Sequence, residues 1–163
     1  MSEIERLKGW MKGISRGPGW HGPAIAHVLK GVTARQAAAR PIESAHTIWE
    51  IVLHMLAWQA WTLRAVKGRR LKHLSPSAAW PPLRETSPAA WRRDRARLLS
   101  HYDRLRAALA DWPEARLAER VRGQPYTFGT LLQGIVHHDV YHTGQLALLK
   151  KAVADRSART KRP

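Results

Sequence analysis

Four long stretches of this chain have the pattern of amphipathic helices, and segments rich in proline and glycine separate them. The stretches are residues 2–13, 48–67, 88–111 and 127–153. One face of the last stretch repeats at steps of three and four residues, which is helical spacing; its members are Leu131, Ile135, His138, His142, Leu146 and Leu149. No stretch shows the apolar–polar alternation of a strand. The pattern predicts an all-α fold, a four-helix bundle.

Short signals predict where the helices begin and how they connect. Thr47 and Glu50 form a capping box before the second long helix, and Ser87 followed by Pro88 predicts the start of the third. Residues 68–86 hold three prolines and are expected to form an irregular connection. Because this connection is long enough to cross the bundle from end to end, the second and third helices can run parallel.

The length of 163 residues fits one domain, which we expect to span residues 1–155 and to be followed by a basic, disordered tail at 156–163. No apolar run approaches the roughly 20 residues needed to cross a bilayer. The charged start of the chain also lacks the apolar stretch of a signal peptide. We therefore expect a cytoplasmic protein without a membrane partner.

The balance of charge is strongly basic. There are 28 Lys and Arg residues against 12 Asp and Glu, a formal net charge of +16. Such a charge attracts polyanions, so nucleic acid is one candidate partner. The basic residues are spread along the chain without a nucleic-acid-binding motif, which favours an ordinary solvated surface. Both interpretations stay open on the sequence.

The chain contains no cysteine, which excludes disulfides, cysteine nucleophiles and thiolate metal sites supplied by the protein. A bound metal would need nitrogen and oxygen ligands, above all histidine. His138 and His142 lie one turn apart on the apolar face of the last helix, and His54 has a comparable place in the second. Buried imidazoles need partners, so these three either hydrogen-bond separately or share a cation.

Three segments of the sequence match a recurring pattern. The segment His138-Asp-Val-Tyr-His142-Thr-Gly-Gln-Leu146 contains H-x-x-x-H-x-G-Q, the second long helix opens with Thr47-Ile-Trp-Glu-Ile-Val-Leu-His54, and Gly19-Trp-His-Gly-Pro23 precedes both. In this order they resemble the DinB/YfiT-like superfamily of metalloenzymes: its paired-histidine motif, its metal-bearing second helix and an N-terminal element of one branch.

This resemblance implies a bundle with up-down-down-up topology, a homodimer, and a divalent metal held by His54, His138 and His142. Zinc and nickel both suit imidazole ligands. Some branches of the family transfer low-molecular-weight thiols to electrophiles, others are maleylpyruvate isomerases, and others have no known reaction. The strongly basic character of this chain is not part of the family pattern.

Three neutral imidazoles would leave a coordination position open, as in catalytic zinc sites. An open position admits water or an exogenous thiol and favours its deprotonated form. We therefore expect an enzyme that activates a low-molecular-weight thiol or water against a small electrophilic substrate, of the thiol transferase or hydrolase type. The alternative is a basic, stress-related binding protein for nucleic acid or another polyanion, with a structural metal.

Some neighbours of the three histidines are candidates for orienting the ligands. Glu50 lies one turn before His54, although its capping role explains it more simply. Gln145 lies three residues after His142 and either contacts a ligand nitrogen or substrate, or is a polar edge residue. Asp139 is expected to point sideways and not to bind the metal.

Other residues are candidates for a pocket near the site. Trp58 could form a wall, although such a residue is usually part of the core. Tyr141 could contribute a hydroxyl, and His21 could reach the site from the break near the N-terminus. Gly134 lies one turn before His138, where close packing of helices or room beside the ion would explain a glycine.

Overall fold

The computed structural model describes the backbone of residues 1–159 and the side chains of residues 1–156. Over this range the chain forms helices and two isolated β-bridges but no strand, so the predicted all-α fold is confirmed. The four long helices are α1 (Glu3–Ser15), α4 (Ile48–Val66), α6 (Pro88–Ala108) and α7 (Phe128–Arg159).

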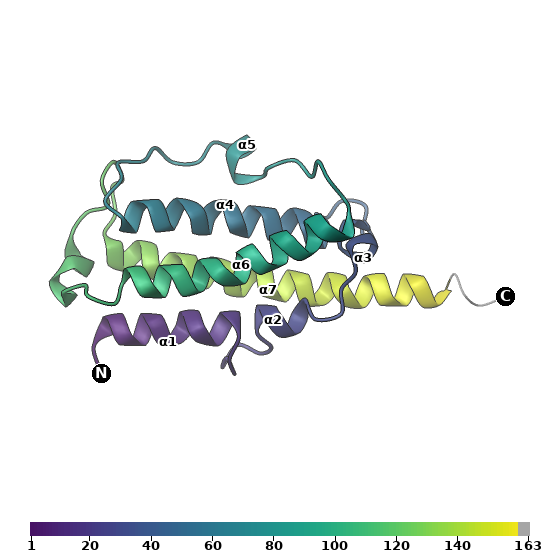
Figure 1. Ribbon diagram of the computed structural model, residues 1–163, viewed down its shortest axis with the longest axis horizontal. Helices are drawn as coiled ribbons and strands as arrows, with labels where there is room; N and C mark the ends of the chain where they lie inside the picture. Colours follow the sequence, from purple (N-terminus) through teal and green to yellow (C-terminus); the bar gives the residue numbers. More distant parts are fainter. Residues whose placement is uncertain (160–163) are drawn as a thin grey trace.

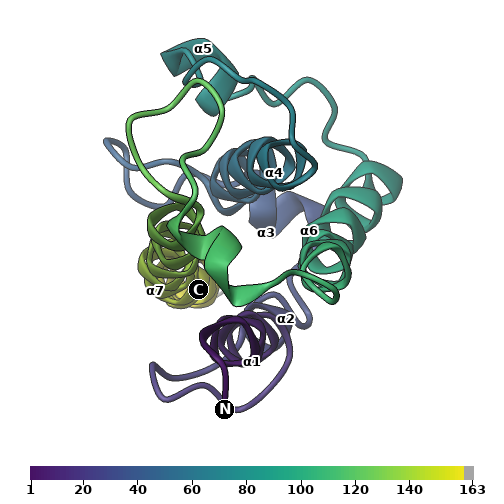
Figure 2. The ribbon, with the colours of Figure 1, turned by 90° about the vertical axis from the view of Figure 1, so that its left-hand side faces the viewer.

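The four long helices lie side by side (Figures 1 and 2). Their buried apolar side chains form one large cluster and a smaller one beside it. α4 packs against α6 and α7, and α1 packs against the same two helices. Figure 1 shows α1 and α7 running in one direction and α4 and α6 in the other, so their order is up, down, down, up. All four helices contribute fully buried side chains to the centre, among them Leu7, Met11, Met55, Leu98, Leu105 and Leu146.

Capping residues fix the starts of the helices. The hydroxyl of Thr47 accepts a hydrogen bond from the backbone N–H of Glu50, and the Glu50 carboxylate accepts one from the N–H of Thr47. This is the predicted capping box before α4, and Ser87 caps α6 as expected. Two short helices, α2 (Ile25–Val28) and α3 (Ala34–Ala38), lie between α1 and α4.

The long connection between α4 and α6 contains a helix that the sequence pattern did not reveal. α5 (Pro76–Ala79) is a single turn, and the Ser75 hydroxyl caps it by accepting from the N–H of Ala78. The pair Ser75-Pro76 starts α5 in the same way as Ser87-Pro88 starts α6. An irregular segment was predicted here because residues 68–86 contain three prolines. Figure 1 shows the connection running outside the bundle along the length of α4. It thereby covers one side of α4.

The remaining boundaries differ modestly from expectation. α6 ends at Ala108, before the predicted end at 111, and the 3-10 helix η1 (Glu114–Ala118) follows it. α7 passes its predicted end at 153 and continues to Arg159. The expected division into a domain at 1–155 and a basic, disordered tail at 156–163 stays a prediction. The last four residues of that tail, 160–163, lie outside the described part of the chain. None of the helices between residues 1 and 159 is both long and apolar enough to cross a bilayer.

Candidate metal centre

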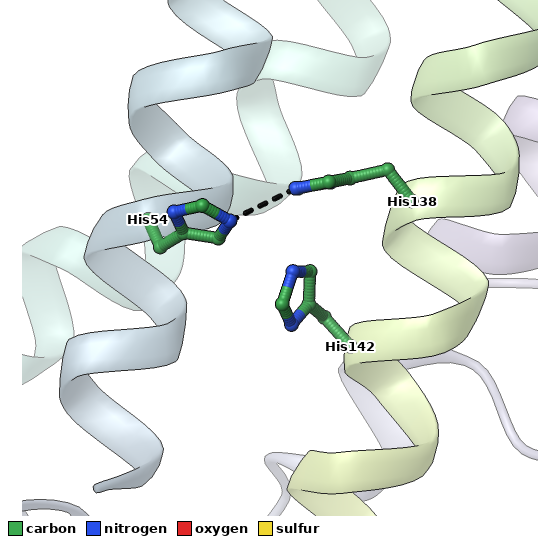
Figure 3. Close-up of side chains that lie close together, drawn as sticks. All are labelled: His54, His138 and His142. Atoms are coloured by element: carbon green, nitrogen blue, oxygen red, sulfur yellow. Dashed lines mark hydrogen bonds between the residues drawn. The ribbon is translucent and has the colours of Figure 1, made fainter. Parts of the chain in front are cut away.

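Two helices bring three histidines together. His54 projects from α4 toward α7, and His138 and His142 project from α7 toward α4, one turn apart (Figure 3). One ring nitrogen from each residue lies within 4.8 Å of the other two. The Nε2 atoms of His54 and His138 are 3.0 Å apart. The three imidazoles that the sequence singled out therefore converge on a shared space.

Each of the three rings is held from behind by an oxygen atom. The Nδ1 atoms donate hydrogen bonds of 2.7 Å to the carbonyl oxygen of Ala79 (from His54), to Oδ1 of Asp139 (from His138) and to Oε1 of Gln145 (from His142). A neutral imidazole carries only one proton. In a neutral ring that holds its proton on Nδ1, the Nε2 atom carries a free lone pair, and the outer oxygen fixes the orientation of the ring.

The inner nitrogens suit a divalent cation. The Nε2 atoms of His54 and His138 lie 3.0 Å apart, at hydrogen-bonding distance. When both rings are neutral and carry their protons on Nδ1, two lone pairs face each other there, and a shared cation would bind both. In tetrahedral coordination with Zn–N bonds of about 2.0–2.1 Å, neighbouring nitrogens lie about 3.3 Å apart. Among the described residues, the cluster contains no fourth His, Cys, Asp or Glu. This composition leaves a coordination position for a ligand from outside the chain.

Burial keeps the imidazoles of His54 and His142 neutral. The side chain of His54 is 6% exposed, and burial, aided by the nearby His142 and His138, lowers its pKa from 6.5 to about 4 against the opposing effect of the Ala79 carbonyl. Burial also lowers the pKa of His142. Both rings are therefore uncharged near neutral pH, which is the form that binds a metal ion.

Asp139 belongs to the site, although the sequence pattern directed attention away from it. Its side chain is completely buried, and besides the bond from His138 it accepts hydrogen bonds from Nε2 of Gln59 at 2.8 Å and from the hydroxyl of Tyr102. Burial and the neighbouring Asp139 carboxylate hold the pKa of Tyr102 well above 10, so its hydroxyl keeps its proton and donates it. The carboxylate thus joins α4, α6 and α7 at the back of His138.

A signal for this network does exist in the sequence. Asp139 follows a candidate ligand on a helix whose neighbouring positions are apolar, and a buried carboxylate requires donors. Tyr102 lies on the buried face of α6, where its hydroxyl also needs a partner. Pairing the two would have required knowledge of the α6–α7 packing, which helical spacing alone does not supply.

Trp80, directly after α5, covers His54 and was also missed. Its ring lies between those of His46 and His54, with centroid separations of 3.8 Å and interplanar angles of 12° on both sides. The carbonyl that orients His54 belongs to Ala79, the preceding residue. The connection that was expected to be irregular therefore supplies both an orienting oxygen and an aromatic cover for the site.

Two pockets reach the triad, one at His142 and the other at His138. A pocket of about 440 Å³ has His142, Gln145, Tyr141 and Trp80 in its wall. A second pocket of about 260 Å³ has His138 and Trp58 in its wall. Tyr141 and Trp58 thus both lie beside a triad member, as pocket residues. The His138 side chain is 24% exposed, so the centre is accessible to small molecules.

Two other candidates lie elsewhere. The Glu50 carboxylate binds the N–H of Thr47 and the guanidinium of Arg40, so it is the capping residue, and Ala79 takes the orienting role that was considered for it. His21 lines a different groove, with Trp10 of α1 and His137 of α7. The Gly- and Pro-rich break near the N-terminus therefore places His21 against α1, away from both pockets of the metal centre.

Comparison with known proteins identifies the family. The model of the DinB superfamily matches residues 20–146, a segment that includes all three histidines. No curated protein and no solved structure matches the chain.

Proposed function

Because the chain belongs to the DinB superfamily, we propose that it is a metal-dependent enzyme. In this proposal His54, His138 and His142 bind one divalent ion, with zinc or nickel as the best suited metals. The reaction is the attack of a low-molecular-weight thiol, or of water, on a small electrophilic substrate. The enzyme is then a transferase if the nucleophile is the thiol and a hydrolase if it is water.

The observation that carries the proposal is the hydrogen bonding of the three rings. All three Nδ1 atoms donate to oxygen atoms of the protein. Histidines that served only to hold the core together could use both ring nitrogens for such bonds. Here the second nitrogen of each ring is directed toward the other two rings, and the cluster offers these nitrogens to a common ligand.

The chain's own residues would orient and shield the reacting groups. A bound divalent ion would act as a Lewis acid that lowers the pKa of a thiol or of water at its open position. Asp139 accepts a hydrogen bond from Nδ1 of His138 and so makes Nε2 of that ring a stronger metal ligand. Gln145 fixes the ring of His142 in the same way. Trp80 covers His54 and limits the access of bulk water from that side. Since the chain has no cysteine, a reacting sulfur would have to arrive with a cosubstrate.

Elemental analysis of the purified protein tests the metal centre. We expect about one zinc or nickel ion per chain in the wild type and a large loss in the His54→Ala variant. His137→Ala is the matched control, because His137 precedes a proposed ligand on α7 yet is exposed and lines the groove beside α1. Circular dichroism would establish that each variant retains its helices. Equal trace amounts of metal in all three proteins would contradict the proposal.

The reaction type is tested with the metal-loaded protein and a chromogenic electrophile, with and without a small thiol. Consumption that requires the thiol identifies a transferase, and consumption in buffer alone identifies a hydrolase. Neither activity should survive in the His54→Ala variant.

Polyanion binding is a second candidate, and one observation favours it. Arg35, Arg92 and Arg95 line a pocket of about 470 Å³, and none of the described residues in its wall is acidic. Three guanidinium groups without a facing carboxylate are suited to phosphate groups. Nucleic-acid binding that weakens steeply with added salt and is lost in the Arg92→Glu variant would support this function. The ring geometry at the metal centre would then serve stability alone.

A further inference from the structure

The smaller pocket beside His138 has an uncharged, largely apolar wall. It lies between α4 and α7, and its volume is about 260 Å³. Trp58, Leu131 and Ile135 supply apolar surface, and among the side chains of residues 1–156 no Asp, Glu, Lys or Arg contributes to its lining. A dry apolar cavity of about 150 Å³ is sufficient for benzene. The pocket can therefore hold a substituted six-membered ring close to a proposed metal ligand.

Gly134 keeps this pocket open. It lies within α7, one turn before His138, and it lines the pocket. Glycine is unfavourable inside a helix, so its presence needs a reason. A Cβ atom built at Gly134 meets no atom within 4 Å, which excludes close helix packing as that reason. Gly134 is exposed, and a larger side chain at this position would take up room in the pocket that the residue lines.

Thr62 offers the pocket a polar contact. Its side chain is completely buried and lines the pocket from α4. Its hydroxyl oxygen has no hydrogen-bond partner among the described residues. A buried hydroxyl without a partner is destabilising, and an oxygen atom on a bound ligand would satisfy it. Apart from Thr62, the polar residues that line the pocket are the more exposed Thr130 and Tyr126, and His138.

We propose that this pocket binds the electrophilic substrate, and that the substrate is a small, uncharged, mainly apolar ring compound with one oxygen that accepts a hydrogen bond from Thr62. Gly134 admits the ring, Trp58 forms one side of the pocket, and His138 places the compound beside the metal centre. The identification of the bound compound as the substrate rests on the proposed function, whereas the binding site itself does not.

Fluorine NMR with two small probes tests the pocket. The probes are 4-fluorophenol, which carries the oxygen, and fluorobenzene, which lacks it. We expect 4-fluorophenol to bind the purified full-length protein with a dissociation constant on the order of 1 mM. In the Thr62→Val variant its affinity should fall by about fivefold, while that of fluorobenzene should not change.

Substitutions that fill the pocket provide the decisive comparison. Gly134→Leu should weaken the binding of both probes by about tenfold or more, whereas Gly134→Ala should leave most of it. Gly9→Leu is the matched control, because Gly9 also lies within a helix with no atom within 4 Å of a Cβ but belongs to α1, outside this pocket. If Gly134→Leu fails to fold, Thr130→Trp at the exposed edge of the pocket should also block both probes.

Unchanged binding in both filling variants, or no saturable binding by the wild type, would overturn the inference. The metal content of the same samples separates this outcome from a failure of the proposed function. A protein that binds both probes but no metal retains the pocket and loses the metal centre. A protein that binds metal but neither probe retains the metal centre and loses the pocket.

Discussion

Asp139 is a fully buried carboxyl group, and none of its partners among the described residues is a lysine or an arginine. The described residues give its carboxylate one charge-capable neighbour, His138 at 2.7 Å, and its other donors are the amide of Gln59 and the phenol of Tyr102. A buried ion without compensation is strongly unfavourable. A divalent cation on the far side of His138 would supply the missing positive charge through the ring, so the carboxylate is a second, independent reason to expect a cation there.

The Asp139→Asn variant tests this link. We expect its affinity for zinc to fall by about 10–100-fold, because an amide oxygen accepts the hydrogen bond from Nδ1 of His138 but carries no negative charge. Asp103→Asn is the control, since Asp103 lies on the same bundle but its carboxylate is half exposed and pairs with Arg16. The measurement is competition with a chelator of known affinity. Equal zinc affinity in Asp139→Asn and the wild type would mean that the carboxylate serves only packing.

The three histidines could be predicted from the sequence. Most of the residues that hydrogen-bond to their outer nitrogens, or support those partners, could not. His54, His138 and His142 occupy helical positions whose neighbours are apolar, so the spacing alone indicates burial. Gln145 is reachable by the same logic, because it lies three residues after His142 on one helix. Ala79 acts through its backbone carbonyl, which no side-chain pattern reveals. Tyr102 and Gln59 depend on how α4, α6 and α7 pack.

At the scale of elements, the connection between α4 and α6 functions as a cover for the site. Its length predicted the crossover, and the capping signals predicted the starts of α4 and α6. The sequence pattern did not predict α5, because the prolines of this connection were treated as helix breakers. Pro76 stands at the first helical position, where proline is favourable. That turn places Ala79 and Trp80 over His54. A segment that joins two helices is therefore also part of the candidate metal centre.

Replacing the aromatic cover tests this role. Trp80→Ala should lower the free energy of unfolding by about 1–3 kcal/mol, because the ring is partly buried against two imidazoles, and should speed the loss of metal to a chelator. Trp80→Phe should restore most of both properties. Trp20→Ala is the control, since Trp20 is fully exposed, and its change should stay within about 0.5 kcal/mol. Identical metal loss in Trp80→Ala and Trp20→Ala would contradict the covering role.

At the scale of the whole molecule, two expectations stay predictions. Analytical ultracentrifugation would test the expected homodimer by measuring the mass of the protein in solution. A polyanion attracted by the charge of +16 would be expected at the arginine-lined pocket. The charge also affects stability, because like charges repel in the compact state. Acidification protonates histidines and so adds to this positive charge. The pH dependence of the free energy of unfolding therefore contains a contribution from the buried imidazoles and one from repulsion among surface charges.

Unfolding of the metal-free protein should depend on pH in a definite direction. In the unfolded chain His54 takes up a proton near its ordinary pKa of 6.5, whereas in the folded protein its pKa is about 4. Between these values the unfolded state binds more protons, so the free energy of unfolding is highest above pH 6.5 and falls as the pH drops toward 4. Burial lowers the pKa of His142 and of His101 as well, and both changes have the same sign.

Urea denaturation at a series of pH values between 7 and 4, in the presence of a chelator, measures this slope. His54→Gln cannot titrate, so its slope should be shallower than that of the wild type, while the repulsion among surface charges is the same in both proteins. Excess zinc should stabilise the wild type near pH 7 by mass action and lose this effect on acidification, because protons compete for the ring nitrogens. Parallel slopes for His54→Gln and the wild type would show that the His54 ring is not held neutral by burial.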